Sequence, residues 1–278
     1  MTRGRFSKLR GMLPFVHITQ TASPTENRLL RVEPIVNSFR KACLEMLRPE
    51  VLSGDEQMVP FSGRSLARQY EPSKPHSVGL KNFILSSSDW LVLDFLIYTS
   101  KRTFSDTDKN ELGLGGEVVK HLQETVPMDH PVHVFSGRFL TGMTLEKFLP
   151  KRNAYLAGKY VANRTRGAAS KLPSENNRNH GESCSVVSSD GEMCNRSKIS
   201  HQKIRKWNDH KSVMILSSAF GINPEGTCRR GSIEKQKQKV DIPQPYCVKA
   251  YNKNMDDWTL WTGTFLITGQ RSLQRGGP

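Results

Sequence analysis

The fold of this chain is decided by Gly54-Asp55-Glu56-Gln57-Met58-Val59-Pro60-Phe61-Ser62-Gly63-Arg64, an apolar run with two adjacent carboxylates near its start. Met58, Val59 and Phe61 predict a strand, and the Ser62-Gly63 pair predicts the turn that closes it. A strand can hold a carboxylate rigidly, as a Mg²⁺ site requires, because Mg²⁺ takes oxygen ligands from carboxylates, water and phosphate. A solvated Asp-Glu pair at a strand edge would have the same sequence, so this stretch alone leaves both interpretations open.

Four further motifs follow this stretch along the chain. They are Arg68-Gln69-Tyr70, Lys74-Pro75-His76-Ser77-Val78-Gly79-Leu80-Lys81, Leu93-Asp94-Phe95-Leu96-Ile97-Tyr98-Thr99 and Leu112-Gly113-Leu114-Gly115-Gly116-Glu117-Val118-Val119. In this order the motifs resemble those of the piggyBac transposases and the cellular proteins derived from them, and the resemblance extends from about Leu13 to Lys253. It implies that Asp55 corresponds to the first of three catalytic aspartates on a ribonuclease-H-like core, and to a metal ligand.

The second aspartate of the family follows the strand that we expect at Val132–Phe135. The family has Asp there, then Asn or Arg and Phe-Phe-Thr, whereas this chain reads Ser136-Gly137-Arg138-Phe139-Leu140-Thr141. Alignment on Arg138–Thr141 puts Gly137 at the aspartate position, and a shift by one residue puts Ser136 there. Neither residue can supply a carboxylate, so we expect the second catalytic position to be lost.

The third aspartate of the family belongs to a Gly-Gly-Val-Asp segment after the motif that matches Tyr251-Asn252-Lys253-Asn254-Met255. This chain continues with Asp256-Asp257-Trp258-Thr259-Leu260 instead. Asp256 and Asp257 fall near the third position but outside the family's motif. Two-metal phosphoryl transfer needs carboxylates that hold two cations about 3.5–4 Å apart. Asp55 alone therefore predicts at most a weak or vestigial metal site.

These departures predict a catalytically inactive protein derived from a piggyBac transposase, a truncated and degenerate copy that retains weak, non-specific DNA binding. A non-enzymatic interaction protein with an acidic protein partner is one alternative. An active Mg²⁺-dependent DNA transposase is the other. We expect no cofactor, and Mg²⁺ if any activity remains.

The net charge of +15 is concentrated in the second half of the chain. Residues 1–150 hold 19 Lys and Arg against 16 Asp and Glu, whereas residues 151–278 hold 22 against 10, a net charge of +12. Such an excess attracts nucleic acid, whose phosphates dominate the affinity. The residues expected to contact DNA are Arg164, Arg166, Lys203, Arg205, Lys206, Lys211, Arg229 and Arg230.

Other patterns bear on the protein's location. The chain contains no apolar run of about 18 residues and no basic amphipathic helix, so a membrane partner is not expected. The first ten residues have no apolar region typical of a secretory signal. Five widely spaced cysteines without a Cys-x-x-Cys motif predict free thiols. With DNA as the partner, we expect a nuclear protein, and its oligomeric state stays open.

The expected fold class is α/β, a ribonuclease-H-like transposase core with a mixed sheet flanked by helices. The predicted strands are Met58–Phe61, Val78–Leu85, Leu91–Tyr98, Val132–Phe135 and Tyr155–Val161, with another at Ser212–Ser218. The predicted helices are Ile35–Leu47 and Glu117–Gln123. Lys101–Glu111 is expected to form a loop, and Lys206–Lys211 a turn.

The domain organisation follows from these elements. We expect a basic and polar N-terminal tail at 1–27, a transposase-like domain at 28–255 and an aberrant C-terminal tail at 256–278. Residues 165–202, rich in Ser, Asn and basic side chains, predict a flexible insertion in the domain. Asp94 lies in a strand expected to be buried on both faces, and we interpret it as a structural carboxylate at a strand edge or in an ion pair.

Overall fold

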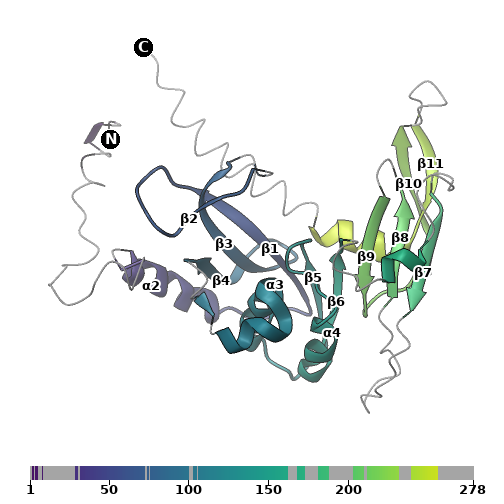
Figure 1. Ribbon diagram of the computed structural model, residues 1–278, viewed down its shortest axis with the longest axis horizontal. Coiled ribbons are helices and arrows are strands. Elements are labelled where there is room, and N and C mark those ends of the chain that lie inside the picture. The colour runs from purple at the N-terminus through teal and green to yellow at the C-terminus, as the bar shows by residue number, and fades with distance from the viewer. Residues whose placement is uncertain are drawn as a thin grey trace.

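The computed structural model describes residues 2, 4–5, 8, 29–30, 32–72, 74, 76–99, 103–104, 106–161, 168–172, 181–187, 203–209, 212–231 and 239–255. Most of the tail expected at 1–27, and all of that expected at 256–278, lie outside these residues. Within them, no helix has the length and apolar character needed to cross a membrane. Figure 1 shows two lobes side by side, with β1 to β4 in one and β7 to β11 in the other.

Strands from both halves of the chain form a mixed sheet. Its first six strands are β1 (Val51–Pro60), β2 (Arg68–Tyr70), β3 (Val78–Ser87), β4 (Val92–Tyr98), β5 (Val132–Ser136) and β6 (Ala154–Lys159). β3 is antiparallel to β1, β2 and β4, whereas β5 is parallel to both β1 and β6. In the resulting order β4-β3-β1-β5-β6, β1 is central. The strands predicted for β3 to β6 are confirmed, with small shifts at their ends.

β1 is longer than the sequence predicted, because pairing rather than apolar side chains holds its first half. The prediction began at Met58, since Ser53 to Gln57 is a polar run. In the structure, β1 pairs with β3 along Leu52–Pro60 and with β5 along Val51–Gly54. β3 pairs with the whole polar run and β5 with its first two residues, and this pairing satisfies backbone hydrogen bonds whatever the side chains are. The polar run therefore lies in the middle of the sheet.

One face of the sheet is covered by α3 (Asp106–Glu124), α4 (Leu145–Phe148) and the 3₁₀ helix η2 (Leu149–Arg152). Buried apolar side chains from strands and helices form a common core here, among them Leu52, Phe83, Leu93, Val118, Leu122, Val134, Leu145, Leu149 and Leu156. Each such side chain contributes roughly 1.5–3 kcal/mol when it is removed from water. This face fixes the positions of the central strands.

α3 differs from the helix predicted at Glu117–Gln123. It begins inside Lys101–Glu111, which was expected to form a loop, and it is kinked at Gly113, where φ is 69°. Gly115 lies against the segment after β5, since a β-carbon there would overlap the carbonyl oxygen of Phe139. The glycines therefore allow a kink and a close approach between α3 and that segment.

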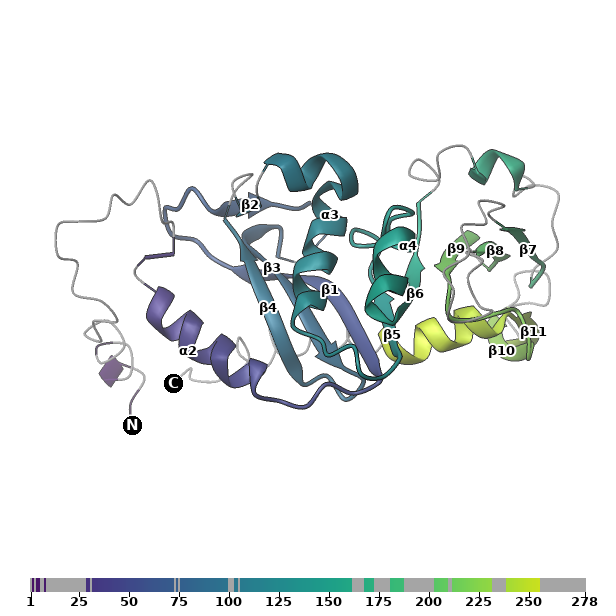
Figure 2. The same ribbon diagram turned by 90° about the horizontal axis from the view of Figure 1, so that it is seen from below.

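The opposite face carries α2 (Glu33–Leu44), which confirms most of the helix predicted at Ile35–Leu47. α2 lies beside β4 in both views (Figures 1 and 2), and its Cys43 packs with Ile84 and Phe95. Four of the five cysteines lie in the described residues, and all four are free thiols, as the sequence predicted.

A second helix on this face spans residues 246–255. Its side chains Val248 and Tyr251 are buried together with Phe135 of β5 and Ala157 of β6. Figure 2 shows this helix in yellow, running from β10 and β11 toward β5. It thus brings the end of the described chain to the central strands.

The second lobe extends the sheet beyond β6. Its elements are the 3₁₀ helix η4 (Ala168–Lys171), β7 (Ser183–Val187), β8 (Lys203–Asn208), β9 (Ser212–Ser217), and the hairpin of β10 (Gly226–Gly231) and β11 (Lys239–Gln244). β9 is antiparallel to β6 and β8, and β7 pairs with β8. β9 confirms the strand predicted at Ser212–Ser218.

Two expectations for this lobe were wrong. Lys206 and Trp207 were expected in a turn but lie in β8, where the Trp207 indole N–H donates to the carbonyl of Pro243 at 2.9 Å. Residues 183–187 of the expected flexible insertion form β7. Polar residues alternate with apolar ones in both segments, so neither is a clear apolar run. Their strand structure therefore depends on neighbours that are remote in sequence.

Candidate active site

The candidate active site lies where β1 and β5 stop pairing. Their last paired residues are Gly54 and Ser136, and the backbone N–H of Gly137 donates to the carbonyl of Gly54 at 3.0 Å. Asp55 and Gly137 are therefore next to each other on adjacent parallel strands. Because side chains alternate along a strand, Asp55 shares the face of Ser53, which is the face of helix 246–255.

The structure distinguishes the two residues considered for the second aspartate position. A β-carbon built on Gly137 would overlap Oδ1 of Asp55 and lie 3.0 Å from its Cγ. Ser136 points elsewhere, because its hydroxyl lies 2.8 Å from that of Thr141. Of the two positions, only 137 therefore faces Asp55, and glycine offers no carboxylate there.

Asp55 itself is half-buried beside a second acid. Burial, and then the nearby charge of Glu56, raise the pKa of Asp55 to about 7, and the ammonium of Lys74 opposes this rise. That ammonium lies 3.4 Å from Oε1 of Glu56 and donates to its backbone carbonyl at 3.2 Å. The local cation therefore pairs with Glu56 rather than with Asp55.

The end of helix 246–255 approaches the same place. The hydroxyl of Ser53 donates to the carbonyl of Asn254 at 2.9 Å, and Met255 is buried. The described end of this helix therefore lies close to β1, two strand positions from Asp55. Asp256 and Asp257 lie outside the described residues.

The donors in this part of the chain do not fit a pair of divalent cations. Mg²⁺ requires several converging oxygens, whereas Asp55 faces the bare backbone of Gly137. Among the residues that the structure describes, no group of three or more His, Cys, Asp or Glu side chains could hold a metal ion.

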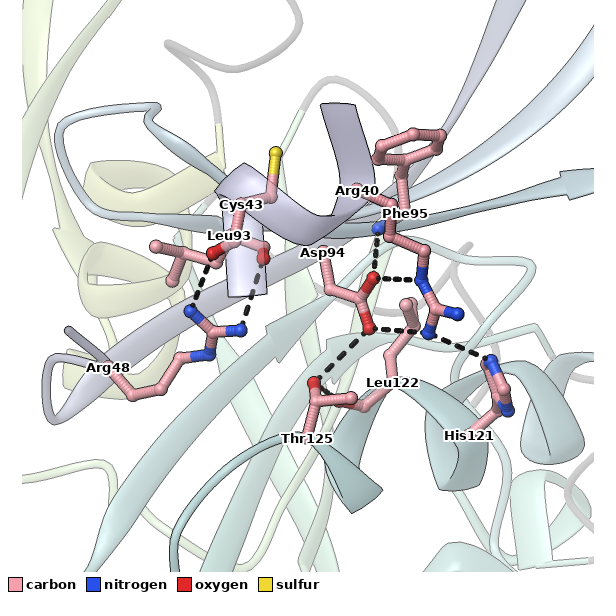
Figure 3. A network of polar contacts seen from close by, with 9 residues as sticks. All are labelled: Arg40, Cys43, Arg48, Leu93, Asp94, Phe95, His121, Leu122 and Thr125. Carbon is pink, nitrogen blue, oxygen red and sulfur yellow. Dashed lines mark hydrogen bonds and ion pairs between the residues drawn. The ribbon is translucent and has the colours of Figure 1, made fainter. Parts of the chain in front are cut away.

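Asp94 belongs to a structural ion pair, as the sequence indicated. Its carboxylate is fully buried and accepts bonds from Arg40 Nε at 2.7 Å and from Arg40 Nη2 at 3.2 Å. The Thr125 hydroxyl donates to the same carboxylate at 3.2 Å, and Arg40 Nη2 lies 3.3 Å from Nε2 of His121. Figure 3 shows that this network connects α2, β4 and the end of α3. The hydrogen bond to Asp94 raises the pKa of Arg40, so this cation stays charged.

The residues expected to contact DNA are spread over different environments. Arg205 is only 3% exposed, so its selection as a surface cation was wrong. Side chains alternate along β8, so Arg205 lies on the same face of the strand as the buried Trp207. Arg230 is paired with Asp209 at 3.1 Å, whereas Arg229 is 77% exposed beside Asp241.

The remaining expected contacts are less well defined. Lys206 is half-buried on β8, and of Lys203 the structure describes the backbone in the same strand. Arg164, Arg166 and Lys211 lie outside the described residues.

Three lysines that the sequence patterns did not point out lie on β6 and on helix 246–255, whose end approaches β1. Lys159 ends β6, and its ammonium lies 5.1 Å from the centre of the Tyr251 ring. Lys249 and Lys253 are exposed on helix 246–255. The spacing of four residues between Lys249 and Lys253 is a helical signal that could have drawn attention to them.

The central strands define the class of this protein. The antiparallel strands β1, β3 and β4 are followed by β5 and β6, which run parallel to β1, and Asp55 of β1 lies beside the end of β5. This arrangement is a ribonuclease-H-like transposase core, as the sequence predicted. The cryo-EM structure of a piggyBac transposase synaptic complex with hairpin DNA has this fold, with a TM-score of 0.67 and 22% sequence identity. The alignment covers 91% of this chain and 48% of that one.

Sequence comparison identifies the family. A family model described as Transposase IS4 matches residues 1–260. The human PiggyBac transposable element-derived protein 3 and the human Chimeric ERCC6-PGBD3 protein are each 25% identical over 259 residues. These alignments cover 92% of this chain but 41% and 23% of the two relatives. The chain belongs to the piggyBac-type transposase family.

Proposed function

We propose that this chain is a transposase-derived DNA-binding protein without strand-transfer activity of its own. The observation that carries the proposal is that the residue facing Asp55 is Gly137. The position that would supply the second carboxylate of the site therefore has no side chain. Two-metal catalysis stabilises both the attacking and the leaving oxygen. A single aspartate whose pKa is raised to about 7 is a poor ligand for either cation.

DNA is the proposed partner for two reasons. Residues 151–278 carry a net charge of +12, which favours polyanions. The solved relative is a piggyBac transposase in a synaptic complex with hairpin DNA. Binding is expected to be weak and independent of sequence, since phosphate contacts position a protein without reading bases. A nuclear location follows from this proposal.

A binding titration tests the proposed partner. Labelled duplexes of unrelated sequence are titrated with the purified protein at about 50, 100 and 200 mM salt. A protein with about four phosphate contacts loses roughly two orders of magnitude of affinity over this range. Equal affinities for the duplexes and a steep loss with salt would support the proposal. Absence of binding at low salt would instead favour an acidic protein partner.

A cleavage assay tests the proposed lack of activity. The same duplexes, with and without the terminal sequences of related transposable elements, are incubated with protein and either Mg²⁺ or Mn²⁺. We expect no strand cleavage with either ion. Cleavage that Asp55→Ala abolishes would show a working active site and overturn the proposal.

A further inference from the structure

Asp55, Gly137 and Lys159 form a row across three neighbouring strands. Gly54 of β1 is paired with Ser136 of β5, and Ser136 is paired with Gly158 of β6. Each residue of the row directly follows one of these partners, so all three belong to the same face. Neighbouring strands are about 4.8 Å apart, which puts Lys159 one strand away from the missing carboxylate.

Helix 246–255 extends this row with further positive charge. Tyr251 packs against the sheet, and the ammonium of Lys159 lies over its ring. Lys249 and Lys253 are exposed on the same helix, about 6 Å apart along its axis. A β-carbon added to Gly226 would lie 3.8 Å from Nζ of Lys249, so this lysine reaches toward β10. The three ammonium groups come from one strand of the sheet and one helix.

The charge of this face suits a phosphate chain better than a metal ion. A metal pair needs a surplus of carboxylates, and here one carboxylate position is glycine while its neighbour along the row is lysine. A lysine ammonium is a compact point charge that binds phosphate directly. Cations on successive helical turns can follow the repeated charges of a nucleic-acid backbone.

We infer that Lys159, Lys249 and Lys253 form a metal-independent contact surface for the phosphate backbone of duplex DNA, next to the vestigial active site. This inference rests on the proposed function and names the part of the surface that carries it. The buried Arg205 and the paired Arg230 are thereby replaced as the principal expected contacts.

The test compares two triple variants with the same change in net charge. Lys159→Gln/Lys249→Gln/Lys253→Gln removes the proposed surface. Lys41→Gln/Lys151→Gln/Lys171→Gln removes three exposed lysines on α2, η2 and η4. DNA affinity is measured by fluorescence anisotropy over a range of salt concentrations, with EDTA present.

We expect the first variant to lose at least about tenfold in affinity near 100 mM salt, and its plot of log K against log salt to be shallower by about 2–3. The control variant should change affinity less than about threefold, because a distant charge is screened. Lys249→Gln/Lys253→Gln alters exposed side chains alone and should show about two thirds of the change in slope. It therefore serves as the test if loss of Lys159 impairs folding.

Three other outcomes would each overturn a different part of this account. Equal affinity of the two triple variants, with wild-type binding intact, would overturn this surface and leave the proposed function standing. Loss of wild-type binding in EDTA would overturn the metal-independent mode. Absence of wild-type binding at low salt, with or without Mg²⁺, would overturn the proposed function itself.

Discussion

At the scale of single residues, the site is defined by the close approach of Gly137 to the Asp55 carboxylate. No side chain at position 137 fits unless Asp55 moves. Asp55 is also held in a partly buried place beside Glu56, and its raised pKa reflects that cost. Both observations concern the same carboxylate, so two substitutions test them separately.

The first substitution restores the missing carboxylate. Gly137→Asp should lower the melting temperature in metal-free buffer, because two carboxylates would then share one site. Mn²⁺ should restore part of this loss by binding between them. Strand cleavage should stay undetectable, since the family's third aspartate motif is still absent.

Gly137→Asn is the matched control for shape. It should be destabilised by similar crowding but should gain nothing from Mn²⁺. Equal responses of the two variants to Mn²⁺ in thermal melts would contradict the assignment of position 137 as a carboxylate position.

The second substitution concerns the pKa of Asp55. This pKa is about 7 in the folded protein, against an ordinary value of 3.8. As pH rises from about 4 to 7, the unfolded chain loses the proton first, so ionisation progressively favours unfolding and the cost is complete above about pH 8. Asp55→Asn should therefore raise the free energy of unfolding at about pH 8 by roughly 1–3 kcal/mol, and change it little near pH 4.

The measurement is denaturant unfolding at several pH values for wild type and variant. Asp241→Asn, which alters an exposed carboxylate paired with Arg229, should shift stability by less than about 1 kcal/mol throughout. A difference between Asp55→Asn and wild type that does not depend on pH would show that the Asp55 carboxyl titrates normally.

At the scale of elements, the ion pair of Asp94 attaches α2 to the sheet. Much of the apolar surface of α2 is exposed, including Ile35 at 49% and Phe39 at 57%. Apolar packing alone therefore holds this helix weakly, and the bidentate contact of Arg40 with Asp94 supplies a directional attachment.

Breaking this pair should be costly. Asp94→Ala should lower the free energy of unfolding by about 2–4 kcal/mol, because the partly buried Arg40 would lose its carboxylate partner and Thr125 an acceptor. Arg40→Met/Asp94→Leu should recover a large part of that loss, since no uncompensated charge remains. Chemical denaturation measures both variants.

Lys41→Met is the control within α2, because Lys41 is exposed. It should change stability by less than about 0.5 kcal/mol. If Arg40→Met/Asp94→Leu were no more stable than Asp94→Ala, the contribution of the pair would be specific hydrogen bonding rather than charge compensation.

At the scale of the whole molecule, the sheet is continuous between the two lobes. β6 of the central core pairs with β9 of the second lobe, and helix 246–255 packs on strands of both. His133 of β5 also stacks with Phe220, at a distance of 5.1 Å between ring centres. These contacts predict that the lobes unfold together.

A substitution far from the active site tests this cooperativity. Trp207→Leu removes a side chain that is 1% exposed and its bond to Pro243. It should lower the stability of the whole protein by about 3 kcal/mol or more, within a single thermal transition. Calorimetry that resolves two transitions, with one unchanged by the substitution, would show that the lobes unfold independently.

The sequence by itself determined the parts of this protein that depend on local pattern. Apolar runs at Val78–Leu85 and Leu91–Tyr98 predicted β3 and β4, because such side chains fit a buried pleated surface. The order of motifs predicted the family. Comparison of Ser136-Gly137-Arg138 with the family's motif predicted that the second catalytic carboxylate is missing.

Only the tertiary structure decided what depends on neighbours remote in sequence. It extended β1 through the polar Ser53–Gln57, since β3 pairs with this whole segment and β5 with its first two residues. It buried Arg205, whose charge suggested the surface, and it brought Lys159 next to Gly137 through the register of β5 and β6. Strand register and sheet face are fixed by pairing and by the core. A pattern of charges along the chain cannot specify them.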